Sequence, residues 1–231
     1  MSTNLNIQFL GHNAWFLRID DFRILIDPFL THSPVAAISA EEAEADLILV
    51  SHGHGDHFGD TLSIAKRTGA TVAAIAEIAG YVEKQGVKKT IAMNLGGGID
   101  FAFGRVQMVH ALHSSTLPDG SPGGSSAGFL LTVQDGRVLY FACDTGLFGD
   151  MALLAEKKID YAFLPIGDLF TMGPEEALNA VKLLRPRIAV PCHYGTWPPI
   201  DQDPEIWKKR VESETETKVR ILRPGQVLGD E

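Results

Sequence analysis

The sequence predicts an α/β fold in which sheets and helices form separate layers. Short runs rich in valine, isoleucine and leucine recur along the chain and are typical of buried strands. Up to residue 98 these runs alternate with segments of helical pattern, an order typical of sheets covered by helices. Because no linker or internal repeat divides the sequence, we expect residues 1–231 to form a single domain.

In the N-terminal part of the chain, the predicted strands are residues 6–10, 14–19, 22–26, 47–50, 70–75 and 90–93. The predicted helices are residues 60–67 and 77–85, and Gly69 and Gly86 end them. Ser39 and Glu42 match a capping box, so a short helical turn is expected there as well.

In the rest of the chain, the predicted strands are residues 99–103, 105–110, 127–133, 137–143, 161–164, 188–190 and 218–222. Helices are expected after Gly146 up to about residue 158, and over residues 174–184 and 204–212. Residues 111–126 are rich in glycine, proline, serine and threonine, which predicts a surface loop. Whether this loop is a lid over a neighbouring site or a plain connector stays open.

Composition and charge disfavour several classes of protein. Hydrophobic residues make up 45% of the chain and charged residues 21%, as in an ordinary soluble domain. No apolar run of about eighteen residues is present, and the first residues lack the pattern of a secretion signal. We therefore expect a cytoplasmic protein that does not bind membranes. The formal charge of −9, without any lysine–arginine cluster, disfavours nucleic acid as a partner and favours a small molecule.

Three histidines and an aspartate lie within six residues directly after the predicted strand over residues 47–50. They are His52, His54, Asp56 and His57. Glycines at positions 53, 55 and 59 allow tight turns that direct these side chains to one point. Imidazole and carboxylate groups suit divalent transition metals, whereas core packing does not explain so many histidines in one loop. A single structural zinc ion is disfavoured, because such sites are usually closed by four cysteine-rich ligands.

Three further candidate ligands, His113, Asp144 and His193, each lie just past the end of a predicted apolar strand. Strand ends place functional groups on loops that a rigid sheet holds. His12 has a similar position beside Gly11, and it is either a pocket residue or a buried structural histidine. These positions predict that distant parts of the chain meet at one metal centre.

The two cysteines, Cys143 and Cys192, are too few for a disulfide scaffold. Each immediately precedes a candidate ligand on a predicted strand, and neighbouring side chains of a strand point to opposite faces. We therefore expect both thiols to be buried core residues that face away from the metals, rather than ligands or redox groups.

The order His52-x-His54-x-Asp56-His57, followed by His113, Asp144 and His193, resembles the metallo-β-lactamase superfamily over the whole chain. A small branch of uncharacterised metal-dependent hydrolases is more similar still. That branch is related to L-ascorbate-6-phosphate lactonase and, more distantly, to phospholipase D-type N-acylphosphatidylethanolamine hydrolases. The shared motifs are Gly11-His12, Ile26-Asp27-Pro28, Ala111-Leu112-His113-Ser114 and Pro191-Cys192-His193-Tyr194-Gly195. One departure is Cys143, because many relatives have glycine before the aspartate.

The resemblance implies a four-layer αββα sandwich with two divalent metal ions at one edge. It assigns His52, His54 and His113 to one metal, Asp56, His57 and His193 to the other, and Asp144 to both. Zinc is the first expectation, and manganese, iron or nickel also suit such ligands. The relatives further imply a homo-oligomer.

The expected function is a binuclear metal-dependent hydrolase of a small cytoplasmic metabolite. A bridging hydroxide is expected to attack an ester, lactone or phosphodiester-type bond, because a divalent metal lowers the pKa of water from about 15.7 to about 7. No side chain offers a comparable nucleophile, since the histidine beside Ser114 is the candidate ligand His113. Asp56 is expected to orient the bridging water, and His12 or Tyr194 to transfer a proton or bind the oxyanion.

Other function classes have less support in the sequence. Di-iron redox members of the superfamily have a glutamate at the position of His54 and carry a flavin domain, and neither feature occurs here. Nuclease members usually carry an additional domain or an arm that binds RNA. A nuclease of the same fold and a non-catalytic metal-binding protein stay open as alternatives, because ligands alone do not prove turnover.

Overall fold

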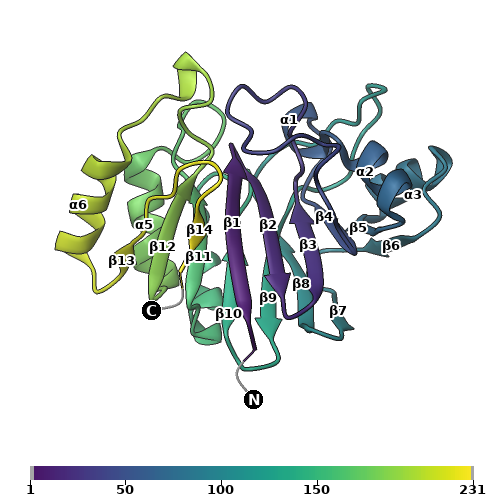
Figure 1. Ribbon diagram of the computed structural model, residues 1–231. Coiled ribbons are helices and arrows are strands. Elements are labelled where there is room, and N and C mark those ends of the chain that lie inside the picture. Colours follow the sequence, from purple (N-terminus) through teal and green to yellow (C-terminus); the bar gives the residue numbers. More distant parts are fainter. Residues whose placement is uncertain (1–2, 230–231) are drawn as a thin grey trace.

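The computed structural model describes residues 3–229, which form two mixed β-sheets and the helices outside them (Figure 1). The first sheet contains β1 (Leu5–Gly11), β2 (Ala14–Ile19), β3 (Phe22–Ile26), β4 (Leu47–Val50), β5 (Thr71–Ile75), β6 (Thr90–Met93) and β14 (Val227–Leu228). The second sheet contains β7 (Gly98–Phe101), β8 (Gly104–His110), β9 (Ala127–Val133), β10 (Val138–Phe141), β11 (Tyr161–Pro165), β12 (Ile188–Cys192) and β13 (Lys218–Val219). The helices are α1 (Gly55–Phe58), α2 (Thr61–Thr68), α3 (Ala76–Lys84), α4 (Met151–Leu154), α5 (Pro174–Leu184) and α6 (Pro204–Glu214).

Each sheet is half parallel and half antiparallel. The strand orders are β14-β1-β2-β3-β4-β5-β6 and β13-β12-β11-β10-β9-β8-β7. Strands β3 to β6 and strands β10 to β13 run parallel, and the remaining neighbours are antiparallel. The sheets lie face to face, so the predicted α/β layers are confirmed as an αββα sandwich.

The core lies between the two sheets and continues under the outer helices. In β10, Leu139 and Phe141 belong to the inner cluster, whereas Tyr140 between them belongs to the cluster under α5 and α6. This alternation explains why the strand is apolar throughout, because both of its faces are buried. Between the sheets, Trp15 packs on Phe141 and Phe163, and the two phenylalanine rings stack with their centroids 4.1 Å apart.

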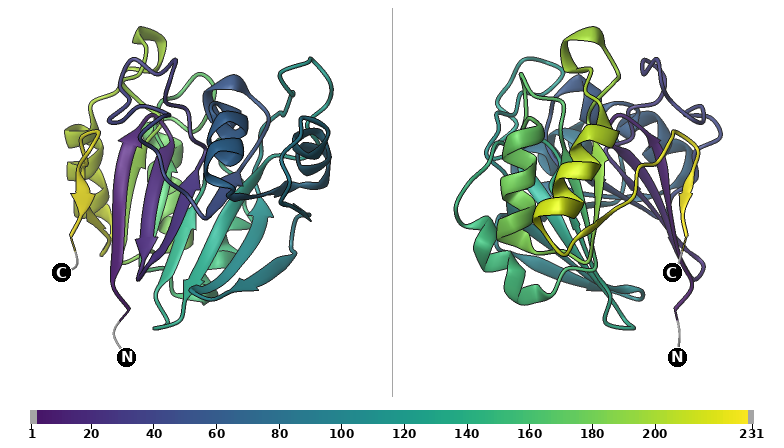
Figure 2. Two further views of the ribbon diagram at one scale, coloured as in Figure 1. Left: turned by 45° about the vertical axis from the view of Figure 1, so that its right-hand side comes forward. Right: turned by 90° about the vertical axis from the view of Figure 1, so that its left-hand side faces the viewer.

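The helices cover the sheets unequally. Helices α2 and α3 pack on β4, β5 and β6 at one side of the first sheet (Figure 1). Strands β1 and β2 have alternating buried and polar positions, such as exposed Asn6 and Arg18, as expected for a sheet with one solvated face. Helix α5 lies on the side of the second sheet that faces away from the first (Figure 2). Within residues 3–229, every helix is too short or too polar to cross a lipid bilayer.

Strand directions bring several loops together at one edge of the sandwich. Strands β1 and β3 are both antiparallel to β2, and β4 is parallel to β3, so these three strands end at the same edge of the first sheet. For the same reason β8, β10 and β12 end at one edge of the second sheet. The loops that follow meet around α1, at the upper end of the molecule in Figure 1.

Some predicted elements differ in the structure. The helix expected up to residue 158 is reduced to α4 and a 3-10 turn over Ala155–Lys157, because the Gly146 N–H donates to Leu112 O and ties the preceding segment to another loop. Ser39 and Glu42 make the reciprocal hydrogen bonds of a capping box, but only a turn follows, since the chain enters β4 a few residues later.

At other places the boundaries or the number of elements differ. The strand expected over residues 218–222 is limited to β13, whose only partner within the described part of the chain is β12. The strand β14 and the short helix α1 were not predicted. Because α1 lies in the loop that contains His52, His54, Asp56 and His57, which we call the histidine loop, this loop is more regular than its composition indicates.

Candidate metal centre

Side chains from the loops after β1, β4, β8, β10 and β12 converge at this edge. His52, His54 and His113 form one group, and His12, Asp56, His57 and His193 form a second. Within each group the potential ligand atoms lie within 4.8 Å of one another. A third set, His52, His57 and Asp144, connects the two groups. The structure thus brings together every residue that the sequence predicts as a metal ligand, and their coordination of metal stays a prediction.

Asp144 lies at the centre of this cluster, with 3% of its side chain exposed. Its Oδ1 atom is 3.0 Å from Nε2 of His57. Its Oδ2 atom is 3.1 Å from Nε2 of His193 and 3.5 Å from Nε2 of His113. A carboxylate that contacts members of both groups occupies the place expected of a bridging ligand.

Buried atoms without hydrogen-bond partners indicate that a cation fits this centre. His57 Nε2, His193 Nε2 and Asp144 Oδ1 are buried, yet none of them has a partner in hydrogen-bonding geometry among the described residues. Leaving such groups unpaired in the interior is costly. Divalent cations between the groups would satisfy these atoms, and imidazoles with carboxylates are suitable ligands for them.

Asp27, to which the sequence analysis gave no role, orients two of the candidate ligands, His57 directly and His52 through Ser51. It is fully buried after β3 and accepts hydrogen bonds from Ser51 N (2.8 Å), Ser51 Oγ (2.6 Å), His57 Nδ1 (2.8 Å) and Asn13 Nδ2 (3.2 Å). Because the Ser51 hydroxyl donates to Asp27, its oxygen accepts the Nδ1–H of His52 at 2.9 Å. Both histidines are thereby oriented with Nε2 toward the centre.

The sequence contains a signal for Asp27 but none for Thr196, the hydrogen-bond partner of His12. Asp27 stands between the apolar run of β3 and Pro28, the same position after a strand that identified the other candidates. Thr196, which binds His12, has no such context, because it lies in a loop of mixed composition.

Charge and burial set the protonation of the central residues in the metal-free protein. Burial alone lowers the pKa of His57, but the carboxylates of Asp144 and Asp27 outweigh it and raise this pKa well above its usual value. Burial raises the pKa of Asp144, but His193 and His57 outweigh it and hold this pKa well below its usual value. Burial lowers the pKa of His52 well below normal, so its imidazole is neutral and can act as a ligand.

His12 lies beneath Asp56 and is almost fully buried. Its Nε2 atom is 3.2 Å from Oδ2 of Asp56, and its Nδ1 atom is 2.8 Å from Oγ1 of Thr196. Burial and the neighbouring His193 lower the pKa of His12 to about 4. The structure therefore places His12 within the second group, where it can orient Asp56, and its role in catalysis stays a prediction.

Tyr194, which the sequence analysis predicts to act in catalysis, belongs to none of the groups of candidate ligands. Its side chain is half-buried and packs against the outer cluster near α5 and α6. Burial raises the pKa of Tyr194 to about 12, with Cys192 and Glu205 contributing. A catalytic role for Tyr194 stays a prediction.

Both cysteines are buried and unbonded to each other. The Cys192 thiol donates to Oδ1 of Asn13 at 3.2 Å, and Cys143 is part of the core between the sheets. Burial raises the pKa of both thiols well above normal, which disfavours reactive thiolates. The expectation that they are core residues is confirmed.

A cavity of about 440 Å³ lies beside the centre. It is lined by His54, Asp56, His113, Ser114, Asp144, Leu169 and Phe170. Ser114 belongs to the 111–126 loop, and in that loop Ser115 Oγ accepts the Gly53 N–H at 3.1 Å while Leu117 is buried. This loop is therefore packed on the histidine loop and contributes to the cavity wall.

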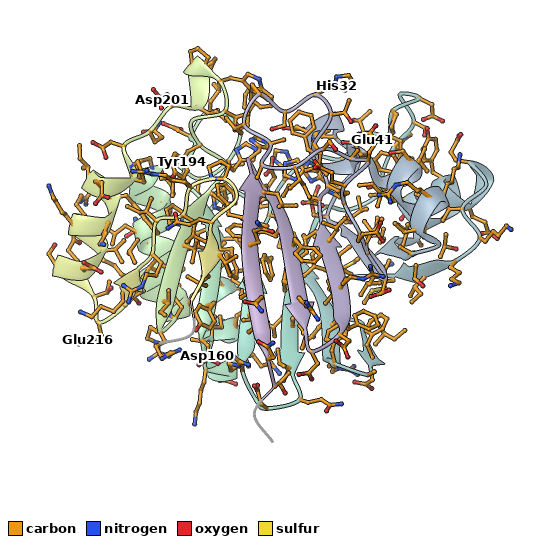
Figure 3. All side chains as sticks on the ribbon, in the orientation of Figure 1. His32, Glu41, Asp160, Tyr194, Asp201 and Glu216 are labelled. Carbon is orange, nitrogen blue, oxygen red and sulfur yellow. The ribbon has the colours of Figure 1, made fainter. Side chains whose placement is uncertain are left out.

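A wider cavity of about 920 Å³ lies elsewhere, between the ends of α5 and α6 and β13, and its lining contains none of the candidate ligands. Asp160 and Glu216 line it, and Figure 3 shows them at the opposite end of the molecule from Tyr194 and Asp201. We therefore take the smaller cavity, which is lined by candidate metal ligands, as the candidate functional site.

Comparison with known proteins gives matches over nearly the whole chain. Residues 22–194 match the family described as beta-lactamase superfamily domain. The UPF0173 metal-dependent hydrolase of Thermus thermophilus is 49% identical over 224 residues, which cover 97% of this chain and 98% of that protein. A UPF0173 metal-dependent hydrolase of Thermococcus kodakarensis is 50% identical over 229 residues, which cover 97% and 99%. Among solved structures, Igni18, a metallo hydrolase from Ignicoccus hospitalis, is similar with a TM-score of 0.89 and 37% identity, over 98% of each chain.

Proposed function

Because the chain belongs to the beta-lactamase superfamily, we propose that it is a metal-dependent hydrolase with a centre for two divalent cations. The observation that carries this proposal is the convergence of histidines and carboxylates from both sheets beside one cavity. The relatives named metal-dependent hydrolases support the reaction class, and the geometry supports the number of cations.

The two groups of side chains would divide the cations between them. His52, His54 and His113 would hold one cation, Asp56, His57 and His193 the other, and Asp144 would contact both. When bound, such cations supply an activated water as the nucleophile and positive charge for the developing oxyanion. Zinc is the first candidate, and manganese, iron and nickel suit the same ligands.

The chain's own residues hold this arrangement and give the substrate access. Asp27 and Ser51 fix the ring orientations of His57 and His52, so their Nε2 atoms are available without rearrangement. Asp56 is the more exposed carboxylate, with 28% of its side chain accessible, and it can accept a hydrogen bond from water or substrate in the cavity. The contact between His12 Nε2 and Asp56 Oδ2 holds the Asp56 carboxylate in place.

A small molecule with an ester, lactone or phosphodiester-type bond is the proposed substrate. The cavity of about 440 Å³ lies within the usual range for small-molecule sites. The acidic chain, with a net charge of −9, does not attract a nucleic-acid backbone, so a nuclease is disfavoured.

Metal content and turnover, measured on the same samples, test the proposal. We expect purified protein to bind two equivalents of Zn²⁺ or Mn²⁺ by elemental analysis and to hydrolyse members of a panel of lactones, esters and phosphodiesters. His54→Ala should lose one equivalent and turnover, and a chelator should abolish turnover. The control is His32→Ala, which removes an exposed histidine outside the cluster and should change neither quantity.

Two results would contradict the proposal. Full metal occupancy without turnover of any panel member would favour a non-catalytic metal-binding protein. Unchanged metal content in His54→Ala would show that His54 is not a ligand, because deletion of a ligand lowers the affinity of the centre for metal.

A further inference from the structure

The loop after β11 carries two strongly exposed apolar side chains. Leu169 is 65% exposed and Phe170 is 58% exposed. Both line the same cavity as the candidate ligands His54, His113 and Asp144. Exposed leucine and phenylalanine side chains side by side at a functional cavity are typical of a binding surface.

The backbone holds this pair in a fixed place relative to the centre. Asp168 and Leu169 have φ values of 62° and 52°, in the left-handed region that residues with a Cβ disfavour. The Leu169 N–H donates to Oδ1 of Asp168 at 2.7 Å, and the Asp168 N–H donates to Met172 O at 3.1 Å. The Met172 N–H in turn donates to the carbonyl of Thr145, the residue after Asp144, at 2.9 Å.

The charges of the cavity limit what can bind beside the scissile bond. Among the described residues that line it, the charged or ionisable groups are carboxylates and imidazoles, and none is lysine or arginine. A second anionic group of the substrate, such as a distal phosphate or carboxylate, would therefore meet no side-chain cation there. An uncharged group would instead bury apolar surface against Leu169 and Phe170.

We propose that Leu169 and Phe170 form an apolar subsite that binds an uncharged aliphatic or aromatic group attached to the scissile bond. This inference rests on the proposed function, because it describes the substrate of the same centre. The occupant is part of a small molecule, since the pair lines a cavity whose other lining residues are Ser114 and four candidate ligands. The subsite selects esters or lactones with an apolar substituent over phosphorylated analogues.

The test uses the metal-loaded full chain and 4-nitrophenyl esters with acyl chains of two to eight carbons. We expect kcat/KM to rise with chain length, by up to about fourfold for each methylene that is fully buried. In the double variant Leu169→Ser/Phe170→Ser this rise should be lost, so that the ratio of kcat/KM for the octanoate ester to kcat/KM for the acetate ester falls to about one. The control is Leu153→Ser, which removes a side chain that is also 65% exposed but lies outside the cavity lining.

A charge comparison and a binding measurement complete the test. The mono-4-nitrophenyl ester of succinate should be hydrolysed less efficiently than the butyrate ester of equal chain length. By isothermal titration calorimetry, octanoate should bind the wild type more tightly than acetate does, and the double variant should lose this difference. Calorimetry reports on the subsite even where no ester is turned over.

The outcomes separate the subsite from the proposed function. Absence of hydrolysis for every ester, with chain-dependent binding of octanoate retained, would contradict an esterase but support the subsite. Hydrolysis that does not depend on chain length would overturn the subsite and leave the hydrolase intact. Two further results for the double variant, each with the wild-type dependence on chain length, would also overturn the subsite. A molar mass by light scattering that differs from the wild type would assign the pair to a subunit contact. Loss of a binding to phosphatidylcholine vesicles that the wild type shows would assign it to a membrane surface.

Discussion

Asp27 is the residue on which the orientation of two candidate ligands depends. Its carboxylate is fully buried and accepts hydrogen bonds from His57 and from Ser51, which in turn binds His52. Residues behind a metal ligand fix its tautomer and raise its basicity, so their loss lowers metal affinity. A residue that touches no metal is therefore expected to decide how tightly metal is held.

We expect Asp27→Asn to weaken metal binding by roughly 10- to 100-fold, because an amide cannot accept all the hydrogen bonds that converge on the carboxylate. Competition with a chelator of known affinity measures the change. Asp21→Asn serves as the control, since the Asp21 side chain is fully exposed and makes one surface ion pair. Equal affinities in Asp27→Asn and the wild type would show that His57 needs no support from Asp27.

His12 makes the metal-free protein sensitive to acid. Its pKa is about 4 in the folded state against about 6.5 in the unfolded chain, so the unfolded chain takes up the proton first. The free energy of unfolding should therefore fall as the pH decreases from about 6.5 to about 4, and His12 alone accounts for about 2 kcal/mol of this loss at pH 5.

Urea denaturation of chelator-treated protein between pH 7 and pH 5 measures this effect. His12→Gln should show a shallower pH dependence than the wild type, whatever its absolute stability. His32→Gln, at an exposed position, should keep the wild-type slope. Parallel slopes for His12→Gln and the wild type would mean that His12 is not held neutral by burial.

The candidate metal ligands could be predicted because few residue types bind metals. The hydrogen bonds that orient these ligands could not be predicted, because they depend on the tertiary structure. Few residue types bind divalent metals, and each candidate follows an apolar strand, so His113, Asp144 and His193 could be predicted as ligands once the cluster at His52–His57 was recognised. The contact between Asp27 and His57 spans 30 positions and depends on the pairing of β3 with β4. No local pattern encodes such a contact.

At the level of elements, periodicity predicted most strands because they are buried on one or both faces. The helix α1 was missed because its residues, Gly55–Phe58, have weak helix propensity and no helical pattern. His12 and His193 adopt positive φ values of 56° and 52°, which the sequence does not indicate for residues other than glycine. These positions are set by tertiary contacts at the centre rather than by local preference.

The loop after β11 packs against the loop of His193 so closely that only glycine fits at position 167. A Cβ atom at Gly167 would lie 2.1 Å from the carbonyl oxygen of His193 and 3.2 Å from Cβ of Ile200. We expect Gly167→Ala to destabilise the protein by about 1–3 kcal/mol and to lower metal occupancy by displacing His193.

Thermal denaturation and elemental analysis measure the two effects of Gly167→Ala. Gly149→Ala is the matched control, because a Cβ atom there would meet nothing within 4 Å. If Gly167→Ala kept both the wild-type melting temperature and the wild-type metal content, the close approach of the two loops would be wrong.

At the scale of the whole molecule, the stack of Trp15, Phe141 and Phe163 joins the two sheets. Phe163 is fully buried, so Phe163→Ala should leave a cavity and reduce the free energy of unfolding by about 3–5 kcal/mol. Phe170→Ala removes the same ring at a position that is 58% exposed and should change stability by less than about 0.5 kcal/mol. Chemical denaturation of both variants measures the contrast, and similar losses in the two would argue against a core between the sheets.

The pairing of β14 with β1 has a consequence for how the molecule is made. Ile7 pairs with Leu228 and Gln8 with Val227, so the outer edge of β1 is covered by a strand from the far end of the chain. At a synthesis rate of roughly 5–20 residues per second, the second strand leaves the ribosome roughly ten to forty seconds after the first. During that interval the outer edge of β1 has no strand partner, so its free backbone donors and acceptors can pair with a strand of another molecule until β14 is in place.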